Sequence, residues 1–306
     1  MSYSVGIDLG GTNLKISLVD SRYKIKDKKV LNTRNFVRKE ELIAAVVNSV
    51  NSFIRVNKLN KPDISAVGLG LPGPIDNKKG IVHFFPNIPG WKNVALRKIL
   101  AAKLKLPVFI DNDANMMALA EYRLGAAKGA RNAICLTLGT GVGGGLIIEG
   151  KIFRGSINAG GEIGHMPVNE KGPKCNCGGV ACLETYIGNK VILAKAKKIF
   201  GKNITLEETS RFAAKGERRA RKLWQDAGEC LGVTLSGIVN LINPDRIVIG
   251  GGVAKAGNVL FDSIKNTIKE RAMPVQAAHV KIYKAILGND AGMIGAAIMA
   301  KEAGKI

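Results

Sequence analysis

Three glycine-rich turns, each placed after an apolar run, are the first places where this sequence could carry chemistry. They are DLGGT at residues 8–12, GTGVGGG at 139–145 and GGG at 250–252. Glycine lets backbone N–H groups come close to phosphate oxygens, and threonine hydroxyls add further donors. The spacing is neither that of a P-loop nor that of a Rossmann fingerprint. One such turn alone is most often structural, but three of them together favour a nucleotide-binding site.

Asp8 stands directly before the first of these turns. Carboxylate oxygens are ligands that Mg²⁺ prefers, so Asp8 could hold this ion directly or through water. The alternative is an aspartate that only caps its own turn.

A group of one histidine and three cysteines is the most specific feature. It consists of His165, Cys175, Cys177 and Cys182. These four residues match a tetrahedral Cys₃His zinc site, and four protein ligands make such a site structural, with no open position for catalysis. Buried thiols without a metal are the alternative. An odd count of five cysteines and no secretory signal argue against a disulfide framework, and Cys135 and Cys230 are expected in the core.

Carboxylates and amides near these motifs could hold a polyol. Glu162 and Glu184 flank the cysteine group, and Asn112 and Asp113 follow the expected strand at 107–111. A rigid sugar needs several fixed acceptors, and strand ends are where α/β proteins place catalytic groups. For Asp113, a plain helix N-cap is an equally good interpretation at this point.

The elements that must position these residues follow from hydrophobic periodicity. The opening reads as strand, turn and strand, and residues 133–150 repeat this layout, with Asp8 set against Thr137. We expect a helix from Glu40, a buried strand in 64–76 that ends in a Pro-Gly-Pro turn, and further helices near 93–104, 184–200, 217–240, 257–271 and 290–303. A short apolar run at 246–253 is also present.

The composition and net charge limit the kinds of partner that this protein is expected to bind. The chain has 306 residues and a net charge of +22, which could attract nucleic acid or anionic membrane. The basic residues are spread along the chain without interleaved aromatics, so we favour a lysine-rich surface and expect no nucleic acid. No apolar run approaches the roughly 18–20 residues of a membrane span, and no signal peptide precedes the first strand. We therefore expect a cytoplasmic protein without a membrane partner.

Taken in order, these motifs resemble the ROK family of sugar kinases and repressors. DLGGTNLK (8–15) and LGTGVGGG (138–145) are similar to its phosphate motifs, AGGEIGH (159–165) and CNCGGVACLE (175–184) to its signature and zinc knuckle, and IGGGV (249–253) to its adenosine segment. PGPID (72–76) and PNIPGW (86–91) look most like the glucokinase branch. The resemblance implies an α/β protein with a two-lobed actin-like ATPase fold, whose ribonuclease-H-like lobes have mixed central sheets.

The resemblance also implies residue roles. Asp113 would be the general base. The sugar would be held by Gly73, Asn87, Asn112, Glu162, His165 and Glu184, with His165 also on the zinc. ATP and Mg²⁺ would be bound by Asp8, Gly10, Gly11, Thr12, Lys15, Gly139, Thr140, Gly141, Gly251 and Gly252. Two departures from the family pattern, Ala181 where glycine is usual and the doubled Gly160-Gly161, affect backbone geometry and remove no ligand.

The expected activity is transfer of the ATP γ-phosphoryl group to the 6-hydroxyl of glucose. Mannose, fructose, N-acetylmannosamine, N-acetylglucosamine and allose stay open as substrates, and a sugar-responsive repressor is the competing class. Such repressors carry a helix-turn-helix before the first phosphate motif, which here begins at residue 8. By resemblance we expect a homodimer, a smaller lobe of residues 1–114 plus 290–306, and a larger lobe of residues 115–289 with the zinc knuckle at 165–182.

Overall fold

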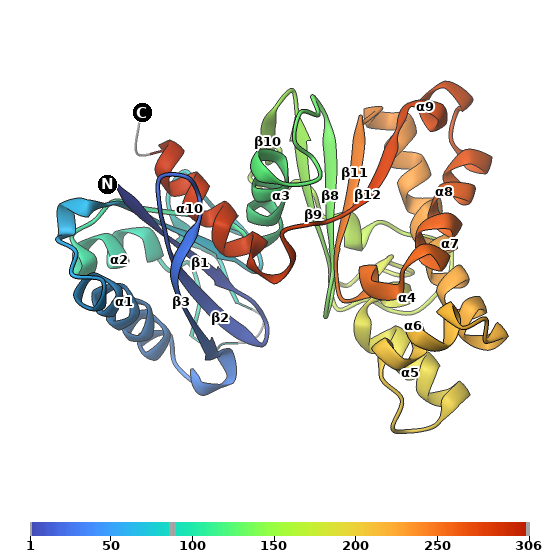
Figure 1. The fold of residues 1–306 in the computed structure, drawn as a ribbon, viewed down its shortest axis with the longest axis horizontal. Coiled ribbons are helices and arrows are strands. Elements are labelled where there is room, and N and C mark those ends of the chain that lie inside the picture. The colour runs from blue at the N-terminus through green and yellow to red at the C-terminus, as the bar shows by residue number, and fades with distance from the viewer. Residues whose placement is uncertain (1, 86–87, 89, 304–306) are drawn as a thin grey trace. The chain divides into compact units, whose positions relative to one another are not determined.

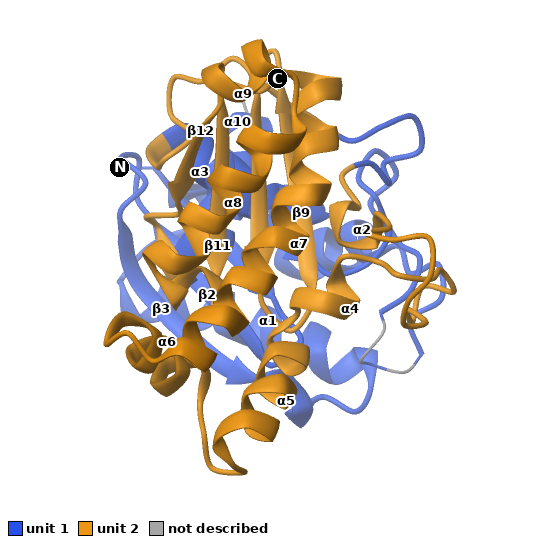
Figure 2. Cartoon of the chain, turned by 90° about the vertical axis from the view of Figure 1, so that its right-hand side faces the viewer, with its two compact units in different colours: residues 1–123, 154–160, 289–306 blue, residues 124–153, 161–288 orange. Residues whose placement is uncertain are grey.

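The computed structural model describes residues 2–85, 88 and 90–303. The chain forms two compact units (Figures 1 and 2). Unit 1 comprises residues 1–123, 154–160 and 289–306, and unit 2 comprises residues 124–153 and 161–288. Among the described residues, no helix is long and apolar enough to cross a membrane.

Unit 1 is built on a five-stranded sheet with the order β3-β2-β1-β4-β7. β2 is antiparallel to both of its neighbours, β3 and β1, whereas β1, β4 and β7 are parallel. The strands are β1 (Tyr3–Leu9), β2 (Asn13–Val19), β3 (Ile25–Asn32), β4 (Ile64–Leu71) and β7 (Val108–Asn112), and a separate hairpin pairs β5 (Ile75–Asp76) with β6 (Ile81–Val82).

Helices cover both faces of this sheet because alternate residues of a strand point to opposite sides. The aliphatic side chains of Ile7 and Leu69, paired across β1 and β4, lie in one core with α1 (Lys39–Val56) and α2 (Leu96–Leu104). On the other face, α10 (Ala291–Ala303) packs on β1 and β4 (Figure 1) and touches α3 (Asp113–Leu124) at Met116.

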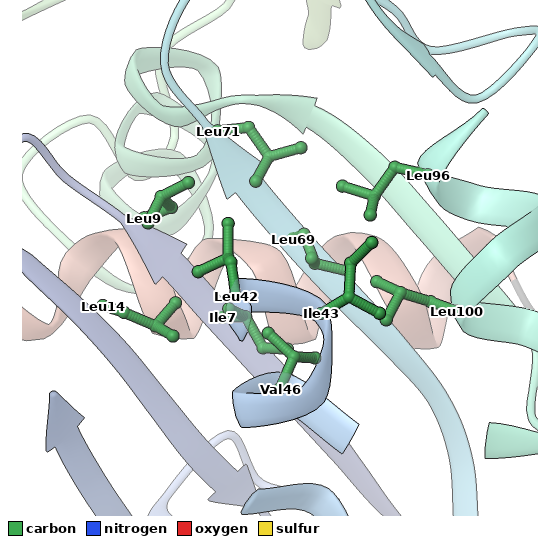
Figure 3. A pocket seen from close by; sticks show the side chains of 10 residues that line it. All are labelled: Ile7, Leu9, Leu14, Leu42, Ile43, Val46, Leu69, Leu71, Leu96 and Leu100. Atoms are coloured by element: carbon green, nitrogen blue, oxygen red, sulfur yellow. The ribbon is translucent and has the colours of Figure 1, made fainter. Parts of the chain in front are cut away.

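A small cavity of about 10 Å³ lies in the core between α1, α2 and the sheet (Figure 3). Only leucine, isoleucine and valine side chains line it, among them Leu9 from β1 and Leu42 from α1. A void of this size without polar partners does not hold an ordered water. The cavity is therefore part of the hydrophobic core and is not a ligand site.

Unit 2 repeats the plan of unit 1 with the sheet order β10-β9-β8-β11-β12. Here too an antiparallel trio is followed by parallel neighbours. The helices α7 and α8 lie side by side in front of this sheet in Figure 2. The strands are β8 (Ala133–Leu138), β9 (Val142–Ile148), β10 (Lys151–Phe153), β11 (Arg246–Gly251) and β12 (Lys281–Lys284), and the helices are α4 (Glu184–Ile187), α5 (Asn189–Phe200), α6 (Leu206–Ala214), α7 (Arg218–Ile242), α8 (Asn258–Arg271) and α9 (Pro274–His279).

Most predicted elements are present, with shifts at their ends. The predicted helix at 93–104 begins at Leu96, because Asn93 has a left-handed φ of 52° and Val94 forms a bridge to Val82. The helical pattern at 184–200 is split into α4 and α5 at Gly188, whose backbone is extended. The strand expected in 64–76 ends at Leu71, where the Pro-Gly-Pro turn begins.

Two glycines, paired with each other across β1 and β4, allow α10 to pack closely against the sheet. Gly6 pairs with Gly68, and a Cβ built on either would overlap a backbone carbonyl oxygen of α10, that of Met293 or of Ala296. Glycine is required here by close approach of two backbones, because neither carbonyl can move without shifting the helix.

We expect Gly68→Ala to destabilise the protein by about 1–3 kcal/mol or more through overpacking. The exposed Gly237 in α7 is the matched control, because a Cβ there meets nothing within 4 Å. Gly237→Ala should raise stability by about 0.5–1 kcal/mol through helix propensity. Thermal unfolding of both variants checks this, and equal midpoints would contradict the packing account.

Candidate functional site

The end of β7 carries Asn112 and Asp113 into the start of α3. The side-chain oxygen of Asn112 accepts hydrogen bonds from the backbone N–H of Ala114 (2.9 Å) and Asn115 (3.4 Å). Asn112 is therefore the residue that caps α3, and Asp113 is the first residue of the helix. Asp113 Oδ1 lies 2.8 Å from the N–H of Ala114. The capping alternative considered for Asp113 thus belongs to its neighbour.

Asp111, directly before these two residues, is a buried carboxylate with three hydrogen-bond donors and one further ion-pair contact. Oδ1 accepts from the backbone N–H of Asn112 (2.7 Å) and from Asn115 Nδ2 (3.0 Å). Oδ2 accepts from Nε of Arg154 at 2.8 Å, and Nη2 of the same guanidinium lies 2.7 Å from it as an ion pair. Sequence reasoning missed both partners: Asp111 reads as part of an apolar strand, and Arg154 is 43 positions away.

Asp8 lies at the end of β1, next to the first glycine-rich turn. Its Oδ2 is 3.3 Å from Lys15 Nζ, which also donates to the Asn289 carbonyl at 2.9 Å. Burial raises the pKa of Asp8 above its usual value, and the charge of Lys15 acts in the opposite direction. A Cβ on Gly292, in the first turn of α10, would come within 2.6 Å of this carboxylate. A side chain at residue 292 would therefore collide with the Asp8 carboxylate.

Thr33 holds the first turn in place. The turn at residues 10–12 joins β1 to β2, and Gly10 N–H donates to the Asn13 carbonyl at 2.8 Å. The Thr33 hydroxyl donates to the Gly10 carbonyl (3.0 Å), and its N–H donates to the Thr12 carbonyl (2.9 Å). Because Gly11 and Thr12 are exposed, their N–H groups can meet a phosphate.

The second glycine-rich turn, at residues 139–141 in unit 2, is tied down by Glu184. The carboxylate of Glu184 accepts from the Val142 N–H at 2.9 Å, and a Cβ on Gly141 would overlap it. Thr140 is exposed. One oxygen of Glu184 is therefore engaged in the turn, a structural contact that the sequence did not indicate.

The third turn meets the second through Asn189, the first residue of α5. Gly251 ends β11 with φ 88°, and a Cβ there would overlap the Leu138 carbonyl. Asn189 N–H donates to the Gly139 carbonyl at 2.9 Å, and the Asn189 side chain borders Gly252. Asn189 Oδ1 is a buried acceptor without a partner among the described residues. Sequence reasoning missed Asn189, which had no motif to mark it.

Glu162 and His165 lie on a tight turn that packs against β9. A Cβ on Gly144 would overlap the Gly161 carbonyl, and one on Gly164 would overlap the Val142 carbonyl, so these glycines serve close backbone packing. The His165 Nε2 lies 3.9 Å from Glu162 Oε2. Both side chains are accessible to solvent: the exposed fraction is 58% for the Glu162 side chain and 35% for the His165 side chain.

The cysteines complete a metal-binding cluster with the other nitrogen of His165. The ligand atoms of His165, Cys175, Cys177 and Cys182 all lie within 4.8 Å of one another. Cys175 Sγ is 3.6 Å from His165 Nδ1, and Cys177 Sγ is 3.7 Å from Cys182 Sγ. Zn–S bonds of about 2.3 Å and Zn–N bonds of about 2.0–2.1 Å in a tetrahedron put neighbouring ligand atoms about 3.5–3.8 Å apart. The cluster fits a structural zinc.

The backbone of the knuckle supports this geometry. Cys175 N–H donates to the Gly179 carbonyl at 2.9 Å, and Gly179 N–H points to Cys177 Sγ at 3.4 Å. Burial and the adjacent thiols raise the pKa of Cys182 to about 12, so the thiolate needs a nearby cation at neutral pH. Ala181, where glycine is usual in the family pattern, has φ 56°, the conformation that glycine adopts most easily.

Two remaining predicted residues lie after β4. Gly73, in the Pro-Gly-Pro turn, has φ 86° and is half-buried, so its backbone is accessible. Asn87 lies outside the described residues. Asp8, Asn112 and Asp113 thus lie at strand ends of unit 1, whereas Glu162, His165 and Glu184 lie outside the strands of unit 2.

Proteins of known family are similar to this chain over nearly its whole length. The family model described as "ROK family" matches residues 4–303. A glucokinase from Halalkalibacterium halodurans is 35% identical over 317 residues, which cover 97% of this chain and 94% of that protein. A ROK family glucokinase from Streptomyces griseus, solved in complex with glucose and AMPPNP, gives a TM-score of 0.84 at 29% identity and covers 98% of this chain and 100% of that chain. The predicted actin-like ATPase fold is confirmed by this similarity.

Repressors are also similar to this chain. A xylose repressor from Caldicellulosiruptor bescii is 29% identical, in an alignment that covers 96% of this chain and 77% of the repressor.

We expect the wild-type protein to hold one zinc per chain and Cys175→Ser to lose it. Loss of the metal should lower the unfolding midpoint by about 5–10 °C. In a unit of this size, each 1 kcal/mol lost from the free energy of unfolding lowers the midpoint by about 2–4 °C. Elemental analysis and thermal unfolding measure the two effects. Cys230→Ser, outside the cluster, should keep its zinc, and a Cys175→Ser protein with full zinc content would contradict the assignment.

Proposed function

This chain belongs to the ROK family, and from that premise we propose that it is an ATP-dependent hexose kinase that phosphorylates the 6-hydroxyl of glucose. The observation that carries the proposal is the position of Asp113 in the fold. Asp113 stands at the carboxyl end of a parallel strand, at the start of a helix that its neighbour Asn112 caps. The 35% identity to a glucokinase over nearly the full chain supports glucose as the substrate.

In this proposal Asp113 accepts the proton of the attacking hydroxyl and orients that oxygen towards the γ-phosphorus. Phosphoryl transfer passes through a loose transition state, so the protein contributes mainly positioning and electrostatics. A weakly basic carboxylate suffices, because the hydroxyl proton leaves late.

The other sugar hydroxyls would be bound by the remaining polar groups. Asn112 has its oxygen in the helix cap, so its Nδ2 would donate to the sugar. Glu162 is a solvent-facing acceptor, and the Nε2 of His165 points away from the cysteines. Glu184 would use its second oxygen. We include Asn87 and the backbone of Gly73 by family resemblance.

ATP would be bound through the three glycine-rich turns. The exposed N–H groups and hydroxyls of Thr12 and Thr140 would meet the phosphates, and the turn at Gly251 and Gly252 would meet the adenosine. Mg²⁺, when bound, neutralises phosphate charge. Asp8, with Lys15 beside it, would hold that ion or its water ligands.

Two alternatives remain within the proposal. Mannose, fructose, N-acetylmannosamine, N-acetylglucosamine or allose could be the preferred hexose, because epimer choice depends on small shifts of hydroxyl partners. The similarity to xylose repressors supports a sugar-responsive regulator as the second candidate function. Family resemblance alone supports a homodimer.

We expect Asp113→Asn to lower kcat for glucose phosphorylation by about 10²–10⁴-fold, since it removes the base and retains the shape. Glucose affinity, measured by calorimetry, should change little. Coupled ADP release measures turnover. Asp262→Asn, an exposed position in α8 with the same chemical change, is the control and should match the wild type. Near-normal turnover in Asp113→Asn would refute the assignment of the base.

We expect glucose to give the highest kcat/KM among the six hexoses, by about tenfold or more, which is about 1.4 kcal/mol of discrimination. The same coupled assay with each sugar tests this. A different preferred hexose would overturn the substrate and keep the kinase. Sugar binding without any ADP release would favour the regulator.

A further inference from the structure

We propose that Arg154 is a positioning residue for Asp113 and acts through the buried carboxylate of Asp111. This inference rests on the proposed function, because it assigns a role in the same reaction. Arg154 itself has no place in the catalytic or binding set described above.

The carboxylate of Asp111 joins three parts of unit 1. Its Oδ1 receives the backbone N–H of Asn112 at the strand end and the Asn115 side chain in the first turn of α3. Its Oδ2 accepts from Arg154 Nε at 2.8 Å and forms an ion pair with Nη2 at 2.7 Å. The side chain of Asp111 is 4% exposed, against 29% for Arg154. A carboxylate this buried has to keep its donors.

The position of Asp113 depends on this carboxylate. Asp113 is preceded by Asn112, whose N–H is held by Asp111, and it is followed by the turn that Asn115 fixes to the same carboxylate. Of the two bonds to Oδ1, one therefore holds the backbone directly before Asp113 and the other holds the side chain of Asn115, two residues after it. If the carboxylate turns, both bonds change, and the base moves with them.

Arg154 is presented by a closed loop and is not a free surface side chain. The chain leaves unit 2 after Phe153, and residues 154–160 belong to unit 1. The carbonyl of Arg154 accepts from the Gly160 N–H at 2.8 Å, and a Cβ on Gly160 would lie 3.0 Å from the backbone of Arg154 and Gly155. The loop thus holds the base of the Arg154 side chain.

Arginine suits this place better than lysine. Nε of the planar guanidinium donates to Oδ2 while Nη2 of the same group lies within ion-pair distance of it, whereas an ammonium is a compact point charge on a flexible stem. Without Arg154, the buried Oδ2 loses its hydrogen bond from Nε and the positive charge beside it. The carboxylate must then rotate or take up a proton, and rotation withdraws Oδ1 from Asn112 and Asn115.

The test compares wild type, Arg154→Ala and Arg154→Lys in the full chain. The readouts are kcat and KM for glucose and for ATP, ATP hydrolysis without sugar, and the unfolding midpoint. We expect kcat for sugar phosphorylation to fall by about a hundredfold in Arg154→Ala and less in Arg154→Lys, because a shift of about 1 Å in a reacting group costs this much. KM for ATP and sugar-independent hydrolysis should stay near wild type, since neither needs Asp113 in position.

Guanidinium ions at millimolar concentration should restore part of the kcat of Arg154→Ala by refilling the site. The control is Arg131→Ala. It removes an arginine from an exposed pair with Glu149 at the same 2.8 Å distance and should change neither kcat nor its response to guanidinium.

The proposal is overturned if folded Arg154→Ala or Arg154→Lys keeps the kcat of wild type. It is also overturned if sugar phosphorylation and basal hydrolysis fall in proportion and guanidinium restores neither, because this is the result of general destabilisation. Should Arg154→Ala fail to fold, Arg154→Lys decides by the same readouts. A wild type without sugar-dependent ADP release would contradict the proposed function and this inference with it, whereas an active wild type with an equally active Arg154 variant contradicts this inference alone.

Discussion

Parallel pairing of β1, β4 and β7 is the constraint on which the candidate site of unit 1 depends. The register sets Asp8 beside Gly70 and Gly70 beside Asp111, so the three residues form one row across the sheet. Parallel strands end at the same edge, which brings the turn after β1, the Pro-Gly-Pro turn after β4 and Asp113 after β7 to that edge. Gly70 has no side chain in this row, and a Cβ there would press on Met116 and approach Asp113 Cα at 3.4 Å.

The same constraint acts in unit 2 on a different set of residues. Parallel pairing of β8 with β11 puts Leu138 beside Gly251, so the second and third glycine-rich turns begin at neighbouring strand ends. Asn189 and Glu184 then hold these turns from the helix side. The cluster of His165, Cys175, Cys177 and Cys182 lies next to the segment that carries Glu162, which has little regular structure of its own.

Much of this architecture could be predicted from the sequence, because its motifs are local. The repeat that sets Asp8 against Thr137 corresponds to two sheets with the same order of strands, and the Cys₃His spacing indicated the cluster correctly. The strands β3 and β12 were not predicted: both are lysine-rich edge strands whose charge hides the usual alternation. The contacts of Asp111 with Arg154 and of Asn189 with the turns depend on tertiary proximity, and no spacing in the sequence encodes them. That Asn112 caps α3 also follows only from its hydrogen bonds in the structure, and the role of Asp113 as the base stays a proposal.

The most direct test of the central claim is ³¹P NMR of the wild-type protein incubated with glucose and MgATP. We expect the γ-phosphate signal of ATP to be replaced by that of a hexose 6-phosphate, in equal amount to the ADP formed. Release of inorganic phosphate in place of the sugar ester, or an unchanged ATP spectrum, would contradict it.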